Sequence, residues 1–102
     1  MAKLGEIARY VRSKSAGPFW VTIDIFCHDA ESFERIARAP QLAPRAIADL
    51  FGVSENAVRQ FRLPSIQVFK ISFPRTAVQG SLGDVDSHAG QYFVPLLPVE
   101  ID

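Results

Sequence analysis

The sequence has little that would tie it to an oxidising compartment, a membrane or a charged polymer. Its single cysteine, Cys27, cannot form an internal disulfide. No apolar N-terminal segment typical of a secretory signal is present, and no apolar run approaches the roughly 20 residues that span a bilayer. Eleven basic residues balance eleven acidic ones, so the cationic excess that binds nucleic-acid backbones or anionic lipids is missing. We therefore expect a cytoplasmic protein whose partners include neither nucleic acid nor membrane.

The familiar catalytic signatures are missing as well. The sequence has no Gly-x-Ser-x-Gly, no His-Glu-x-x-His and no Gly-x-Gly-x-x-Gly. The sequence therefore does not match the common patterns of serine hydrolases, zincins or dinucleotide-binding proteins. No segment repeats, and 102 residues with 48% hydrophobic and 22% charged side chains are typical of one globular domain with a modest core. We expect a single domain over residues 1–102.

Three helices are predicted from periodicity and capping residues. Near the N-terminus, four apolar residues recur at helical spacing, namely Leu4, Ile7, Ala8 and Val11. This pattern predicts an amphipathic helix from Leu4 to Arg12. Asp29 is a suitable N-cap for a second helix over Ala30 to Ala39. Pro44 suits the first turn of a third helix, which Gly52 would end.

Two runs have the composition of strands. Phe19 to Phe26 is dense in aromatic and β-branched residues and predicts a central strand. Ile66 to Phe73 alternates between its two faces and predicts a second strand, half buried and paired with the first. Tyr92 to Leu97 is interrupted by proline, which predicts an edge strand or an extended tail. Together the elements predict an α+β fold, a small mixed or antiparallel sheet with helices packed on one face.

A charged residue lies within each predicted strand. Asp24 interrupts an apolar run, where an unpaired carboxylate costs several kcal/mol to bury. We favour an Asp24 side chain that is exposed at a sheet edge. The alternatives are that Asp24 is paired with another charge or has a function. Lys70 raises the same question in the second strand. The two side chains can pair across neighbouring strands, and the lysine can also meet an anionic substrate.

The aromatic residues of the two strands exceed what one layer of helices is certain to cover. They are Trp20, Phe26, Phe69 and Phe73. Either all four belong to the core, which we favour, or some of them cover an interface with a partner protein.

The segment Ala46 to Arg59 offers an alternative function. A small residue within one helix, Gly52 at a turn and a second helix capped by Ser54 form the pattern of a helix-turn-helix, which would use Ser54 to Gln60 to read DNA. Pro64 leaves that second helix little room, and the neighbouring residues are poor in the cations that anchor phosphates. Any compact corner between two helices gives the same pattern.

A glycine-punctuated loop from Gln79 to Gln91 contains the spacing Asp84-x-Asp86-x-His88. In an extended segment these three side chains point the same way, about 7 Å apart per step of two residues. Such a loop can build a site, although aspartate and glycine also simply make turns. Metal and cofactor requirements stay unassigned.

Several segments together resemble one known family. They are Leu4 to Lys14, Ala16-Gly17-Pro18-Phe19-Trp20, Thr22-Ile23-Asp24, Lys70-Ile71-Ser72-Phe73-Pro74-Arg75, and Gln79-Gly80-Ser81-Leu82-Gly83-Asp84 with Asp86, His88 and Gln91. They resemble the DUF4387 family of small bacterial proteins over nearly the whole chain. Ser15 departs from the family pattern, which has asparagine there, and Ala89 stands where glycine is usual.

The resemblance implies a partner and a reaction class. Members of the family are usually encountered beside, or fused to, proteins similar to the large acyclic terpene utilisation protein AtuA. It therefore implies the small subunit of a two-component catabolic enzyme, most naturally a hydratase or lyase acting on a small (di)carboxylate or acyl-CoA compound. The competing hypothesis is a structural or regulatory subunit without catalytic residues.

Residue chemistry fits a hydratase or lyase. His88 would carry the proton, because an unperturbed imidazole titrates near neutral pH, at about 6.5. Asp84 or Asp86 would orient the imidazole or hold a cation. The candidate ligands of the substrate carboxylate or acyl group are Arg12, Lys14, Lys70, Arg75 and Ser81.

Overall fold

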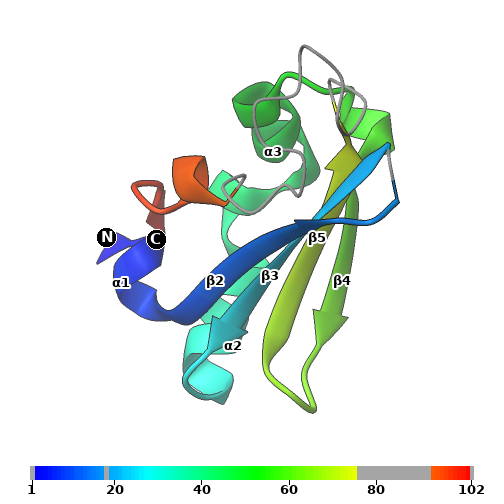
Figure 1. The fold of residues 1–102 in the computed structure, drawn as a ribbon. Helices are drawn as coiled ribbons and strands as arrows, with labels where there is room; N and C mark the ends of the chain where they lie inside the picture. Colours follow the sequence, from blue (N-terminus) through cyan, green and yellow to red (C-terminus); the bar gives the residue numbers. More distant parts are fainter. Residues whose placement is uncertain (1, 18, 76–92, 102) are drawn as a thin grey trace.

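The computed structural model describes residues 2–17, 19–75 and 93–101 of the chain (Figure 1). In chain order the elements are β1 (Ala2–Lys3), α1 (Leu4–Ile7), β2 (Ala8–Ser15), β3 (Trp20–Cys27), α2 (Ala30–Arg38), the 3₁₀ turn η1 (Pro40–Leu42), α3 (Pro44–Phe51), the 3₁₀ turn η2 (Glu55–Ala57), β4 (Arg59–Leu63), β5 (Val68–Pro74), the 3₁₀ turn η3 (Val94–Leu96) and β6 (Glu100–Ile101).

The main sheet has four strands in the order β2-β3-β5-β4, and every neighbouring pair is antiparallel. The two predicted strands are confirmed within a residue or two, and they pair with each other, with Asp24 opposite Lys70. β3 is an interior strand, as predicted. The α+β fold with an antiparallel sheet is therefore confirmed.

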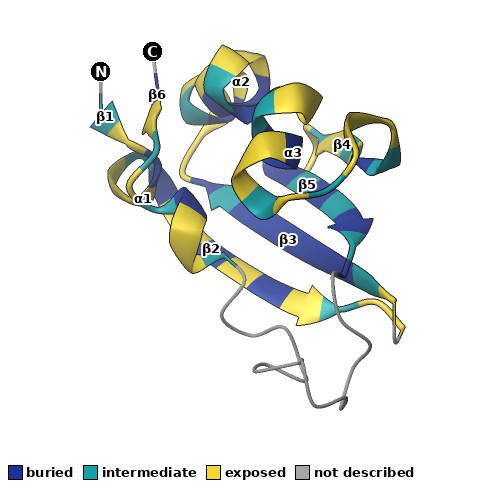
Figure 2. Ribbon diagram, turned by 90° about the horizontal axis from the view of Figure 1, so that it is seen from above, coloured by how far each residue is buried: buried dark blue, intermediate teal, exposed yellow. Residues whose placement is uncertain are grey.

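Helices α2 and α3 cover one face of this sheet (Figure 2). Ile23 and Ile25 of β3 join Phe69 and Ile71 of β5 in the core beneath them. The predicted caps of both helices are confirmed. The Asp29 carboxylate accepts the backbone N–H of Ser32 at 2.8 Å, and α3 ends at Gly52, whose φ of +70° suits glycine.

The two ends of the described chain lie side by side (Figure 1). β1 pairs with β6, and the N–H of Leu4 donates to the carbonyl of Val99 at 2.8 Å. The predicted edge strand or extended tail over Tyr92 to Leu97 is wrong in its described part, because η3 forms a turn there. Pro95 favours this outcome, since its fixed φ suits the first positions of a helical turn.

The predicted helix from Leu4 to Arg12 is also wrong beyond its first turn. α1 stops at Ile7, and β2 follows. The register of β2 against β3 shifts between Ala8 and Tyr10, which marks a β-bulge. The extra residue puts buried Ala8 and Val11 three positions apart instead of two, so a bulged strand imitates the spacing of a helix.

The second helix of the helix-turn-helix hypothesis is replaced by other structure. Over Ser54 to Gln60 the chain makes only the single turn η2 and then enters β4. β4 was not predicted. Its five residues form a hairpin with β5 through the turn over 64–67. Their backbone groups are therefore satisfied by pairing with β5 and not by the hydrogen bonds of a helix.

No helix in the described part of the chain is long and apolar enough to cross a membrane.

Candidate functional site

The side of the four-stranded sheet away from α2 and α3 is called here the open face. Strand alternation and the cross-strand register place on it Tyr10, Arg12 and Lys14 of β2, Trp20, Thr22, Asp24 and Phe26 of β3, Arg59, Phe61 and Leu63 of β4, and Val68, Lys70, Ser72 and Pro74 of β5. Asp24 is the only carboxylate among these strand residues, against four cationic side chains. The open face is therefore positive although the whole chain is neutral.

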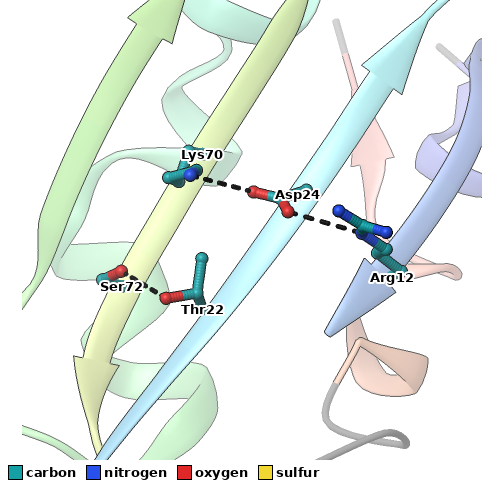
Figure 3. A network of polar contacts seen from close by, with 5 residues as sticks. All are labelled: Arg12, Thr22, Asp24, Lys70 and Ser72. Carbon is teal, nitrogen blue, oxygen red and sulfur yellow. Dashed lines mark hydrogen bonds and ion pairs between the residues drawn. The ribbon is translucent and has the colours of Figure 1, made fainter. Parts of the chain in front are cut away.

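Asp24 lies at the centre of an ion cluster that joins three strands (Figure 3). Arg12 and Lys70 are its partners in the register on either side. The Arg12 Nε lies 3.5 Å from Asp24 Oδ2, and the Lys70 Nζ lies 3.8 Å from Oδ1. The predicted pairing of Asp24 with Lys70 is confirmed. The favoured exposure of Asp24 at a sheet edge is wrong, because β3 is flanked on both sides and leaves the residue 5% exposed.

Arg12 is held from two directions. Besides the ion pair at Nε, its guanidinium carbon lies 5.4 Å from the centre of the Phe26 ring. That ring in turn packs against Tyr10, with 5.3 Å between the ring centres. The sequence predicted a cationic substrate-binding residue here, but the structure shows that Arg12 lies within a strand and is oriented by neighbouring strands.

A polar contact extends the cluster along the same face. The hydroxyls of Thr22 and Ser72 lie 3.0 Å apart across β3 and β5 (Figure 3). Thr22 is buried, so this contact satisfies polar groups in the middle of the sheet. Nothing in the sequence alone identified this pair, because it depends on the register.

Two hollows open on this side of the molecule. One of about 140 Å³ is bounded by Arg12, Asp24, Phe26, Leu63, Ile66, Val68 and Lys70. The other, of about 530 Å³, has Arg9, Tyr10 and Phe26 among its described walls. Phe26 borders both hollows. A molecule lying across this ring would contact aromatic surface on one side and the ion cluster on the other.

The aromatic residues divide between the two faces of the sheet. Phe69 and Phe73 are buried in the core, as predicted. Trp20 and Phe26 are only partly buried and lie on the open face, so the prediction that all four belong to the core is wrong for these two. The face also carries Tyr10 and Phe61, which are 54% and 48% exposed. Sequence analysis missed Phe61, although the alternation of Phe61 and Leu63 with the polar residues Gln60 and Arg62 is a strand signal.

The remaining predicted site residues fall into three groups. Lys14 lies on the open face opposite Thr22, one strand repeat from Arg12. Arg75 is buried and its N–H donates to the carbonyl of Phe19 at 2.7 Å. It follows the end of β5, where the register no longer brings it next to Asp24 as it brings Lys70. The predicted residues Ser81, Asp84, Asp86 and His88 lie outside the described residues.

Cys27, at the end of β3, is not a reactive thiol. Burial, together with the charge of Asp29, raises its pKa to about 11. The thiol is therefore protonated at neutral pH, whereas metal binding and nucleophilic attack require the thiolate. Within residues 2–17, 19–75 and 93–101, no three His, Cys, Asp or Glu residues gather as metal ligands would.

The comparison with protein families identifies the chain. A family described as a domain of unknown function, DUF4387, matches residues 4–100. The chain belongs to the DUF4387 family. The resemblance seen in the sequence is thereby confirmed, and the match extends from the start of α1 to the first residue of β6. The comparison with curated proteins gave no match, and neither did the comparison with solved structures.

Proposed function

We propose that this DUF4387 protein is the small subunit of a two-component catabolic enzyme and binds an AtuA-like large protein through its open face. The observation that supports this best is the composition of that face. When one face of an antiparallel sheet is exposed to solvent, the residues on that face are usually polar. Here the face carries the aromatic residues Tyr10, Phe26 and Phe61 together with Arg12 instead, and aromatic residues and arginine are the types enriched in protein interfaces.

Co-expression with an AtuA-like protein tests the docking. We expect a stable complex with an interface above roughly 1,000 Å². Phe61→Glu should prevent co-purification, because it replaces an exposed aromatic side chain of the open face by a carboxylate that is costly to bury in an interface. Leu50→Glu is the matched control, since Leu50 is similarly exposed, at 42%, but lies on α3 away from the open face. Equal loss of the complex in both variants, or none in either, would contradict this docking surface.

We further propose that the complex is a hydratase or lyase acting on a small (di)carboxylate or acyl-CoA compound. The cations of the open face support the substrate class, because they offer donors to a carboxylate. His88 would act as the general acid or base, with Asp86 or Asp84 orienting it. The alternative is a structural or regulatory subunit, in which the loop that contains these residues has no chemical role.

Variants of the loop separate the two possibilities in the assembled complex. If the loop is catalytic, His88→Ala and Asp86→Asn should each lower turnover by on the order of 10²-fold, with little change in melting temperature. If the loop only makes turns, Gly83→Ala and Gly90→Ala should lower stability rather than rate. Full turnover in both His88→Ala and Asp86→Asn would leave the chain as a noncatalytic subunit.

A further inference from the structure

We infer that Arg12 and Lys70, fixed on either side of Asp24, form a binding site for a small aliphatic carboxylate in the 140 Å³ hollow of the open face. The biological role of such a ligand rests on the proposed function. The binding itself is a property of this chain alone.

Arg12 is prepared to receive a carboxylate. The ion pair with Asp24 involves the Nε of its guanidinium, and the group lies over the Phe26 ring. No acceptor among the described residues takes a hydrogen bond from Nη1 or Nη2, and the side chain is 49% exposed. These two nitrogens form the fork that matches the two oxygens of a carboxylate. Because the side chain is already oriented, little rotamer entropy is lost when the ligand binds.

The charges of the cluster favour an anion with a single charge. Asp24 offsets one of its two cationic neighbours, which leaves one positive charge at the mouth of the hollow. Lys70 is 36% exposed, and its 3.8 Å separation from Asp24 Oδ1 is longer than a hydrogen bond. Its ammonium can therefore turn an N–H towards a ligand while it stays close to Asp24.

The walls of the hollow indicate what the rest of the ligand is. The hollow has a volume of about 140 Å³ and opens to solvent, so a short chain fits in it beside the carboxylate. Phe26, Leu63 and Val68 give this chain an apolar wall. A short aliphatic acid such as isobutyrate satisfies both conditions.

Titration of the isolated chain with isobutyrate, followed through backbone amide NMR signals, tests the site. We expect shifts in β2, β3 and β5 with a millimolar dissociation constant, and much smaller shifts with the neutral analogue isobutyramide. Arg12→Gln should weaken binding about tenfold or more, the effect of losing a charge-assisted hydrogen-bond pair. Arg38→Gln is the matched control, because Arg38 also meets a carboxylate through Nε, but on the exposed surface of α2.

Lys70→Met is the second variant, and it should weaken isobutyrate binding several-fold even if Arg12→Gln disturbs the fold. Equal binding of isobutyramide, or unchanged affinity in folded Arg12→Gln, would overturn the inference. The inference would also be overturned if isobutyrate does not bind but Arg12→Gln still disrupts the complex with the large protein. In that case the carboxylate that Arg12 binds would belong to the large protein and not to a small ligand. Binding of isobutyrate by a chain that forms no complex would refute only the proposed function.

Discussion

The two faces of β3 are buried to a similar degree by different means. Ile23 and Ile25 belong to the hydrophobic core on the face that α2 and α3 cover. Thr22 and Asp24 face the other way and are nearly as buried, but their neighbours on the adjacent strands are polar: the Ser72 hydroxyl contacts Thr22, and the cations of Arg12 and Lys70 flank Asp24. Burial alone therefore does not show which face of the sheet is covered by helices. The polarity of the neighbouring side chains distinguishes the two faces.

The largest effect that separates the two faces is expected from core truncation. Ile23→Ala removes a fully buried side chain between the sheet and its helices. It should lower the free energy of unfolding by about 2–5 kcal/mol, through lost burial and the cavity left behind. Denaturant unfolding of the purified variant measures this.

Thr22→Ala is the paired variant on the adjacent residue of the open face. It removes the hydroxyl contact with Ser72 and should cost about 0.5–1.5 kcal/mol, the net worth of one hydrogen bond. If the two substitutions destabilise equally, the open face is held by packing as tight as that of the core, and the contrast between the faces fails.

The covered face was largely predictable from the sequence, because its elements obey local rules. Asp29 and Gly52 marked the helix ends correctly, and the alternation from Ile66 to Phe73 indicated a half-buried strand. β2 was not recoverable in this way. A single extra residue at its bulge shifted the apolar spacing from two to three, and three is also a helical spacing.

The candidate site was predictable only in part. Asp24 and Lys70 stood out because charges within apolar strands must be explained. The partnership of Arg12 with Asp24 required knowing that residues 8–15 form a strand, and the contact of Thr22 with Ser72 required the register. Such cross-strand relations are set by pairing between segments distant in sequence, so local patterns do not contain them.

An intermediate effect is expected from Asp24→Asn. The change keeps the shape of the side chain but removes the charge that stands between two cations. Because Arg12 and Lys70 remain partly solvated, the cost should be about 1–3 kcal/mol, below the 3–5 kcal/mol typical of a fully buried pair. The double variant with Lys70→Met should lose less stability than the sum of the single variants, because they share one interaction. Strict additivity would show that the cluster does not act as a unit.

The smallest effect is expected at Asp29, which caps the helix α2 on the covered face. The backbone N–H and the side chain of Ser32 donate to its carboxylate, and these hydrogen bonds lower its pKa below the ordinary value of 3.8. Because the pKa is lower in the folded state, the ionised cap stabilises the fold at pH values above the ordinary pKa. This contribution disappears as the pH falls through the folded-state pKa.

Asp29→Ala should therefore lower the melting temperature slightly at neutral pH, and the difference from the unmodified chain should narrow in acid. Asp29→Asn keeps an acceptor for Ser32 and should recover most of the loss at neutral pH, without the dependence on the ionisation of residue 29. A deficit in Asp29→Ala that stays constant down to strongly acidic pH would show that the side chain stabilises α2 by something other than its charged cap.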